Sequence, residues 1–317
     1  MMIAVHAPAK INLSLRVLGT RADGYHNLWT LLQSLALHDT LTCRSVPGPF
    51  RIDSTDPACP TGPDNLVWRA AELLWRAGGR RGRPRNTVVR IRKQIPIRAG
   101  LGGGSSDGMA ALRGLSALWR VALSRDWRRA IAATLGADAS FFLDGGTAVA
   151  VERGDLVFRL FDCPAQWVTL VVPPFGVDTG AAYRWWDEAG RAHGQRDTKG
   201  RNAKPVSRGE RSGEPARGAG IPVWNGGHDG PFGNDLEPVV AARHPELAAI
   251  VSALNERGAS LAAMSGSGSA VFGLFGSRVR AEAAARALGR DGHRTIVTRT
   301  LGRSRYQAMT RPRRREL

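Results

Sequence analysis

The stretch best suited to chemistry is a glycine-rich run over residues 100–106, in which four glycines are followed by two serines. Glycine allows backbone conformations closed to other residues, so its N–H groups can approach a ligand closely. A helix is predicted directly afterwards, over residues 108–119, and a helix N-terminus carries partial positive charge. We expect this run to bind the phosphates of a nucleotide. A linker or a tight turn is the alternative interpretation.

Other kinds of phosphate loop are excluded by the residues that close the run. A Walker A loop ends in Gly-Lys-Ser/Thr, whereas here no lysine lies inside the run. Positive charge for the phosphates would have to come from elsewhere in the chain. The candidates are Lys10, Lys93 and Arg98.

A second loop of glycine and serine covers residues 265–269, between two apolar runs. It could converge with the first loop on one ligand, or it could simply form a bulged hairpin. Lys10 and Asn12 share one face of a strand predicted over residues 10–17, where apolar and polar residues alternate. That alternation is typical of a half-buried strand, so both could equally be surface residues.

Asp138 precedes two phenylalanines and could act chemically or only cap a helical turn. His26 beside Tyr25 could form a platform for stacking, or only the end of a hairpin. The sequence contains no HExxH motif and no cluster with metal-ligand spacing, so metal ligands stay unknown.

Composition limits the class of protein. Apolar residues make up 43% of the 317 residues, enough for a packed core. No run approaches the roughly 18 apolar residues of a membrane helix, and no secretory signal is recognisable. The three cysteines contain no CxxC pair, which excludes a disulfide scaffold or a zinc ribbon. These features predict a cytoplasmic globular protein.

Two segments hold most of the net charge of +18. Residues 69–98 contain ten Arg or Lys against one acid, and residues 303–315 add six arginines without an acid. Such charge could attract nucleic acid, a membrane surface or a polyphosphate ligand. Arginine is also the favoured polar surface residue throughout, and this simpler interpretation is preferred. Neither nucleic acid nor a membrane is therefore expected as a partner, and residues 303–317 are expected to form a mobile basic tail.

The pattern of apolar residues favours an α+β fold, because strands and helices alternate irregularly with hairpin-like pairs. Residues 27–37 could form a strand or a short helix. Residues 188–233 are poor in apolar side chains and resemble a flexible insertion. The remaining helices are predicted over residues 64–77, 236–256 and 278–288, and the remaining strands over residues 87–95, 146–151, 167–172, 260–264 and 270–275.

Taken together, these segments resemble the GHMP kinase superfamily. The matching segments occur in the family's order and cover residues 8–13, 21–26, 100–107, 136–138, 234–238 and 264–270. The resemblance implies two lobes with the active site in the cleft between them. The implied N-terminal ATP-binding lobe is 1–155, and the C-terminal lobe is 156–302 with the insertion at 188–233.

Residues 21–26 resemble the branch of the superfamily that phosphorylates 4-diphosphocytidyl-2-C-methyl-D-erythritol. The implied reaction transfers the γ-phosphate of ATP, with Mg²⁺, to the 2-hydroxyl of this compound in the non-mevalonate isoprenoid pathway. The expected partner is thus a small molecule carrying a cytidine diphosphate, and the expected assembly is a monomer or a weak homodimer.

The resemblance also implies a role for individual residues. Asp138 is the implied general base and Lys10 its charge partner. Asn12 would orient the methylerythritol, Tyr25 would stack on cytosine, and His26 would hydrogen-bond to the edge of the base. The implied ATP-binding residues are Asn65, Leu66, Lys93, Pro96, Gly100, Leu101, Gly102, Gly103, Gly104, Ser105 and Ser106. The other implied substrate-binding residues are Thr179, Tyr183 (a second aromatic wall), Gly266 and Ser267.

Arg98 and Ala99 depart from the pattern, since many members have glycines there. Alternative functions are a homoserine or mevalonate kinase, a nucleic-acid-binding protein, or a nucleotide-binding regulator without catalysis. Homoserine and mevalonate contain no nucleobase, so a kinase for either would leave Tyr25 and His26 without a base to bind. The second leaves both glycine loops unexplained, and the third does not explain why Lys10 and Asp138 are both present.

Overall fold

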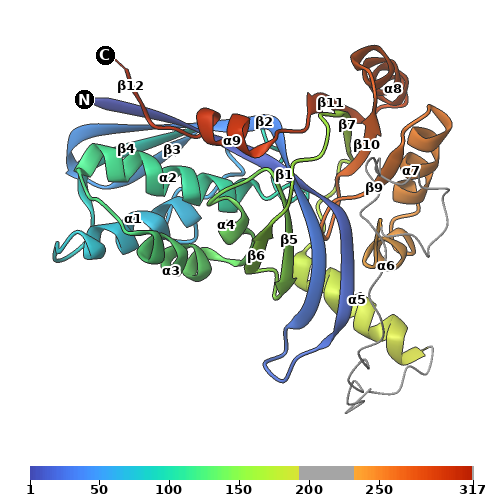
Figure 1. Cartoon of the computed structure of the whole chain (residues 1–317), viewed down its shortest axis with the longest axis horizontal. Coiled ribbons are helices and arrows are strands. Elements are labelled where there is room, and N and C mark those ends of the chain that lie inside the picture. Colours follow the sequence, from blue (N-terminus) through green and yellow to red (C-terminus); the bar gives the residue numbers. More distant parts are fainter. Residues whose placement is uncertain (193–231, 316–317) are drawn as a thin grey trace, which may run out of the picture.

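The computed structural model describes residues 1–192 and 232–315 and forms two lobes (Figure 1). The expected α+β class is confirmed. Helix α5 (Thr179–Ala192) includes the first residues of the insertion expected at 188–233, and most of the remainder lies outside the described residues.

In the described part of the chain, the first lobe is built on an eight-stranded sheet with the central order β12-β1-β2-β4-β3. Helices α1 and α2 bury apolar side chains against one face of this sheet. Residues 27–37 form a strand, not a helix. The strands are β1 (Met2–Thr20), β2 (His26–Pro49), β3 (Arg51–Ser54), β4 (Arg85–Arg92), β5 (Thr147–Glu152), β6 (Leu156–Arg159), β8 (Gly233–Asn234) and β12 (Arg313–Arg315). The helices are α1 (Leu66–Ala77), α2 (Gly103–Trp119), α3 (Arg125–Leu135) and α4 (Ala137–Phe141).

The second lobe has a four-stranded antiparallel sheet in the order β11-β7-β10-β9, with helices α5 to α8 packed on one face. The single helix expected over residues 236–256 is wrong, because the chain turns at His244 and Pro245 between two helices. Proline lacks the N–H that a continuous helix needs. The elements are β7 (Trp167–Val172), β9 (Leu261–Met264), β10 (Val271–Phe275), β11 (Arg294–Arg299), α6 (Glu237–Ala241), α7 (Glu246–Glu256) and α8 (Arg278–Arg290).

Strand β1 passes through every part of the apolar core. Ile3 lies in the core of the first lobe, Ile11 in the layer between β1 and the second sheet, and Leu15 in the core of the second lobe. Because β1 is covered on both sides, Lys10 and Asn12 are 3% and 4% exposed. The expected half-buried strand is therefore wrong, and these two polar residues are held inside the protein.

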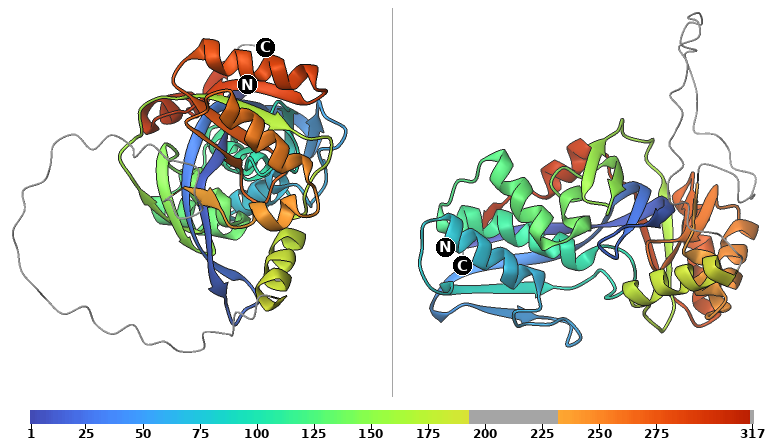
Figure 2. Two further views of the ribbon diagram at one scale, coloured as in Figure 1. Left: turned by 90° about the vertical axis from the view of Figure 1, so that its right-hand side faces the viewer. Right: turned by 90° about the horizontal axis from the view of Figure 1, so that it is seen from below.

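The C-terminal segment is not the mobile tail that was expected. Helix α9 (Arg303–Met309) buries Tyr306 completely, and the Tyr306 hydroxyl donates a hydrogen bond of 2.7 Å to the carbonyl of Phe142. Strand β12 then pairs with β1, beside the start of the chain (Figure 2). A buried aromatic anchor thus holds this basic segment against the first lobe.

His6 on β1 gives the first lobe a predictable response to acid. Burial, followed by the positive charges of His38, Arg313 and Arg315, lowers the pKa of His6 from 6.5 to about 4. Between these two values the unfolded chain binds a proton that the folded protein does not. Stability should therefore be complete above pH 6.5 and decrease as the pH falls towards 4.

A His6→Gln variant tests this. Urea unfolding followed by circular dichroism at pH 7.5, 5.5 and 4.5 should show a smaller loss of stability on acidification than in the wild type. Gln307→Ala, at an exposed position of α9 without a titratable side chain, is the control and should keep the wild-type slope. Equal slopes for the His6 variant and the wild type would contradict the argument.

Candidate active site

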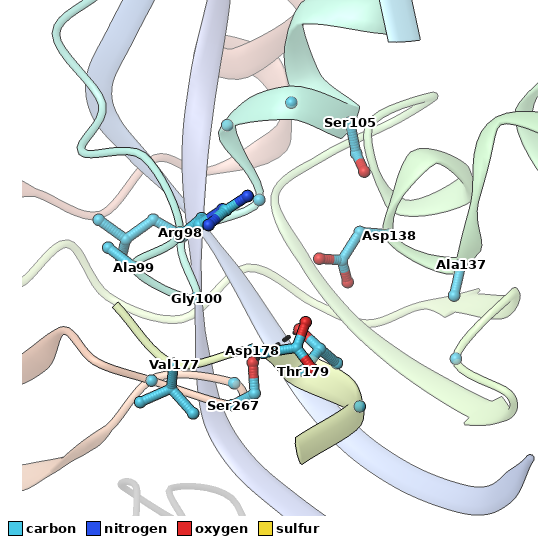
Figure 3. A pocket seen from close by; sticks show the side chains of 18 of the residues that line it. Arg98, Ala99, Gly100, Ser105, Ala137, Asp138, Val177, Asp178, Thr179 and Ser267 are labelled. Atoms are coloured by element: carbon cyan, nitrogen blue, oxygen red, sulfur yellow. Dashed lines mark hydrogen bonds between the residues drawn. The ribbon is translucent and has the colours of Figure 1, made fainter. Parts of the chain in front are cut away.

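A cleft of about 1200 Å³ lies between the lobes and is lined from both (Figure 3). It brings together every implied site residue except Ser106. The hydroxyl of Ser106 instead donates a hydrogen bond of 2.7 Å to the carbonyl of Pro8, and the residue is 1% exposed. Ser106 therefore joins α2 to β1 and does not face the cleft.

The glycine-rich run is half loop and half helix. Helix α2 begins at Gly103 and not at residue 108, so Gly103, Gly104 and Ser105 form its first turn. Gly102 precedes it in the left-handed region, with φ of 68°. The first N–H groups of a helix have no acceptor within it and carry partial positive charge. The run therefore presents backbone donors and a helix terminus to the cleft, as a phosphate site requires.

The two glycine loops touch each other, which the sequence left open. The Ser265 hydroxyl donates to the carbonyl of Gly100 at 3.0 Å, and the N–H of Ala270 donates to the carbonyl of Ala99 at 3.2 Å. The hydroxyls of Ser267 and Thr179 lie 2.9 Å apart, so the start of α5 joins the same assembly. Gly266 is held by Asn234, whose amide donates to its carbonyl at 2.7 Å.

Lys10 and Asp138 form an ion pair in the cleft, with 3.4 Å between Nζ and Oδ2. Lys10 also donates to Asn12 Oδ1 at 2.7 Å, and the Asn12 amide donates to the Thr30 hydroxyl at 2.8 Å. The Lys10 side chain is 4% exposed, whereas that of Asp138 is 39% exposed. A fixed ammonium therefore supports a carboxylate open to the cleft. Asn12 orients Lys10, a role the sequence did not predict.

Lys93 lines the cleft, but its ammonium is already bound to two buried carboxylates. It donates to Asp39 and, at 2.8 Å, to Asp107 at the start of α2. Asp39 also accepts from the N–H groups of Gln94 and Ile95. Burial raises the pKa of Asp107 to about 8, against the opposing effect of the Lys93 ammonium. This cluster fixes the chain that enters the glycine-rich run. The sequence missed Asp39 and indicated Asp107 only as part of the matching segment 100–107.

Asn65 and Leu66 lie where α1 approaches α2. Asn65 caps α1, since its side-chain oxygen accepts from the N–H of Val67 at 2.8 Å, while its amide donates to the carbonyl of Pro60 at 2.5 Å. A Cβ on Gly108 would lie 3.1 Å from that of Leu66. By capping α1, Asn65 fixes the start of this helix, and with it Leu66, in the wall of the cleft.

Arg98 is exposed, lines the cleft and has a φ of 55°, unusual for a residue with a side chain. Its guanidinium points into the pocket in Figure 3. Arg98 thus adds a cation beside the glycine-rich run.

The far end of the cleft is aromatic. Tyr183 stacks on His26 with ring centroids 4.8 Å apart, and His26 Nε2 lies 2.9 Å from Oδ1 of Asp187. Tyr25 is 60% exposed, with the guanidinium of Arg153 5.6 Å from its ring. The Tyr183 ring therefore covers one face of the His26 ring, whereas Tyr25 is open to the solvent. Burial, and then the charge of Asp138, raise the pKa of Tyr183.

Comparison with known proteins identifies the family. Models of the GHMP kinases N terminal domain and the GHMP kinases C terminal domain match residues 65–146 and 225–294. The 4-diphosphocytidyl-2-C-methyl-D-erythritol kinases of Pelotomaculum thermopropionicum and Moorella thermoacetica are each 40% identical over 301 residues. These alignments cover 95% of this chain and 98% and 99% of the relatives. The chain belongs to the 4-diphosphocytidyl-2-C-methyl-D-erythritol kinase family.

Comparison with solved structures supports the same family. A crystal structure of a 4-(cytidine 5'-diphospho)-2C-methyl-D-erythritol kinase matches this kinase with a TM-score of 0.71 and 32% identity, covering 94% of this chain and 99% of the other. A homoserine kinase from Cytophaga hutchinsonii has a TM-score of 0.62 at 17% identity, covering 98% of this chain and 96% of its own, and shares the fold alone. The two-lobed GHMP fold and a small-molecule kinase are thereby confirmed.

None of the kinase's helices within residues 1–192 and 232–315 combines the length and the low charge needed to cross a bilayer. In those same two ranges, no three His, Cys, Asp or Glu side chains gather in a way that could hold a metal ion.

The sequence also missed Asp187 in this kinase. Asp187 follows Tyr183 by four residues on α5, a spacing that places two side chains on one helical face. Had a helix been predicted over residues 179–192, the common face of Tyr183 and Asp187 would have been recognisable. The expectation of a flexible segment from residue 188 obscured it.

Proposed function

We propose that this kinase transfers the γ-phosphoryl group of ATP to the 2-hydroxyl of 4-diphosphocytidyl-2-C-methyl-D-erythritol, a step of non-mevalonate isoprenoid synthesis. The observation that carries the proposal is the position of the Lys10–Asp138 ion pair. It lies in one cleft with a helix N-terminus suited to phosphates and with the aromatic cluster around His26. The names of the relatives at 40% identity support the choice of substrate.

ATP would bind in the half of the cleft beside α2. Its phosphates would accept hydrogen bonds from the N–H groups of Gly103, Gly104 and Ser105, and Gly100, Leu101 and Gly102 would shape the loop around them. The base would lie towards Asn65, Leu66 and Pro96, with Lys93 holding this wall through its two aspartates. Mg²⁺ would enter with ATP and would be bound mainly by phosphate oxygens and water, as is common in kinase sites. The Ser105 hydroxyl, which points into the cleft in Figure 3, would be its protein contact.

Asp138 would accept the proton of the attacking hydroxyl, since its carboxylate is open to the cleft. Lys10 would keep that carboxylate ionised and offset negative charge around the transferred phosphoryl group. Most of the catalysis would come from positioning and electrostatics, as is usual for phosphoryl transfer.

The substrate would occupy the opposite half of the cleft. Its cytosine would lie at Tyr25 and His26, with Tyr183 supporting His26 from behind. Thr179, Gly266 and Ser267 would border the diphosphate and methylerythritol. We further propose lobes over 1–155 and 156–302, with β6, β8, α9 and β12 adding to the first, and a protein that works as a monomer or a weak homodimer.

The direct test measures ATP consumption with and without 4-diphosphocytidyl-2-C-methyl-D-erythritol, with homoserine and mevalonate in parallel. Turnover with the cytidine compound alone supports the proposal. Turnover with homoserine or mevalonate instead would keep the fold and overturn the assignment of Tyr25 and His26 to cytosine.

Asp187→Ala should weaken binding of the cytidine substrate. The carboxylate holds His26 through a 2.9 Å contact, and loss of one hydrogen bond to a charged group costs about 1.5–3 kcal/mol. We expect KM for this substrate to rise roughly tenfold or more, with KM for ATP nearly unchanged. Initial rates over a matrix of both substrates measure this. Asp187→Asn keeps an acceptor and should recover much of the loss, whereas an equal rise in both KM values would indicate a general structural defect.

A further inference from the structure

The two segments that hold the excess charge, far apart in sequence, meet on one face of the first sheet. Strand β12 pairs with β1, β1 with β2, and β2 with β4. The register places Arg313 opposite Ala4, Ala4 opposite Thr42, and Thr42 opposite Arg90. Arginines from the C-terminus and from the 69–98 segment therefore lie in one row across the sheet.

A neighbouring row adds further charge. Arg315 lies opposite Met2, and Met2 opposite Arg44 on β2. On β4, Arg92 follows Arg90 by two residues and so points to the same side. The side chains that alternate with these rows, such as Ile3 and Val89, belong to the core under α1 and α2. We call the opposite, outward surface the arginine face; it consists of Arg44, Arg90, Arg92, Arg313 and Arg315.

All five arginines are exposed, and none makes a side-chain hydrogen bond or an ion pair to any residue the structure describes. At the outward positions of these strands the single acidic residue is Asp53, which lies 3.8 Å from Arg51 and is thereby matched. The positive field reaches His6, since Arg313 and Arg315 both contribute to lowering its pKa. Within residues 1–192 and 232–315, the five charges of this face thus have no local compensation.

The layout suits a regular polyanion. Arginines two residues apart on a strand are about 6.6 Å apart, and the rows on β12 and β4, three strand spacings apart, are separated by roughly 14 Å. This separation resembles the width of a duplex major groove, about 12 Å. The outward positions of these strands hold no Phe, Tyr or Trp that could stack on unpaired bases. The imidazole of His6 lies on this face, but it packs edge to face against that of His38, with ring centroids 4.4 Å apart. Of the large apolar side chains at these positions, Val88 is 5% exposed and Met2 stands alone, which leaves too little apolar surface for insertion into a membrane.

Contrary to the expectation from the sequence, we propose that the arginine face binds double-stranded nucleic acid through its phosphate backbone, without base sequence preference. None of the five arginines lines the active-site cleft. Binding would therefore leave the kinase reaction accessible and would place the enzyme on nucleic acid.

Fluorescence anisotropy with a labelled 20-base-pair DNA duplex, at 50 to 300 mM KCl, tests the proposal. For four or five phosphate contacts, the logarithm of affinity should fall with the logarithm of salt with a slope of about −4. The variant R90A/R92A/R313A/R315A should bind at least tenfold more weakly at 100 mM KCl, with a slope near −1. The lysine variant of the same four positions should keep binding, which shows that β12 remains in place.

The matched control is R125A/R129A/R286A/R290A, which removes the same charge from exposed positions on α3 and α8. It should bind the duplex within threefold of the wild type, and all variants should keep the wild-type melting temperature and ATP turnover. Equal losses in the face and control variants would overturn the proposal, because net charge alone would then explain binding. No binding by the wild type at 100 mM KCl would also overturn it, as would face-dependent binding to phosphatidylglycerol vesicles but not to the duplex.

Discussion

Asp138→Asn is expected to lower kcat by about 10²–10⁴, the usual contribution of a general base. The amide cannot accept the proton of the attacking hydroxyl, yet it has nearly the same shape as the carboxylate. The Asp138 side chain is 39% exposed, so the change should leave stability and KM for ATP close to wild type. Single-turnover rates at saturating ATP and substrate measure the chemical step.

Asp178→Asn is the matched control. Asp178 also lines the cleft, but among the residues that the structure describes its carboxylate accepts only from the N–H of Ala181, at 2.8 Å. An amide oxygen can accept the same bond, so kcat should change by less than about fivefold. If the two variants lost activity equally, Asp138 would have no special part in proton transfer.

Gly100→Ala should have the largest effect on stability and on ATP binding together. A Cβ at Gly100 would lie 2.0 Å from the carbonyl oxygen of Ser265, and φ there is 73°. The left-handed conformation costs about 1–2 kcal/mol for a residue with a Cβ, and overpacking adds about 1–3 kcal/mol. The two glycine loops would have to separate. We expect a melting temperature lower by roughly 5–15 °C and a clearly raised KM for ATP.

Gly104→Ala serves as the control within the same run. A Cβ at Gly104 meets nothing within 4 Å, and Gly104 lies in the first turn of α2. Thermal melting should show little change or a small gain, because alanine favours a helix over glycine. Equal destabilisation by both substitutions would show that close contact between the loops does not explain the need for Gly100.

Much of the fold could be predicted because it depends on local patterns. The alternation along residues 10–17 and the apolar face of residues 64–77 specify a strand and a helix directly. The catalytic candidates were likewise recognisable from short segments, and the cleft brings all but Ser106 together. The Ser106 side chain points away because helix α2 begins at residue 103, which changes which positions of the run face outward.

What could not be predicted depends on distant partners. Asp39 is buried against Lys93, 54 residues away, and the pairing of β12 with β1 joins the two ends of the chain. No local pattern specifies such contacts. The arginine-rich end resembles a solvated tail in sequence, but buried Tyr306, the hydrogen bonds of Arg303 to Leu160 and Thr147, and the pairing of β12 with β1 fix it to the fold.

The position of strand β1 in all three apolar clusters determines how the protein unfolds. Since Ile3, Ile11 and Leu15 belong to three different apolar clusters, neither lobe can lose its packing without taking a strand from the other. Heating should therefore produce a single calorimetric transition, with van't Hoff and calorimetric enthalpies that agree. A chain cut between the lobes at residue 155 would yield a C-terminal half without Leu15 and Val17 of β1, which pack in its core. The two lobes are therefore halves of one cooperative unit, and neither is expected to fold without β1.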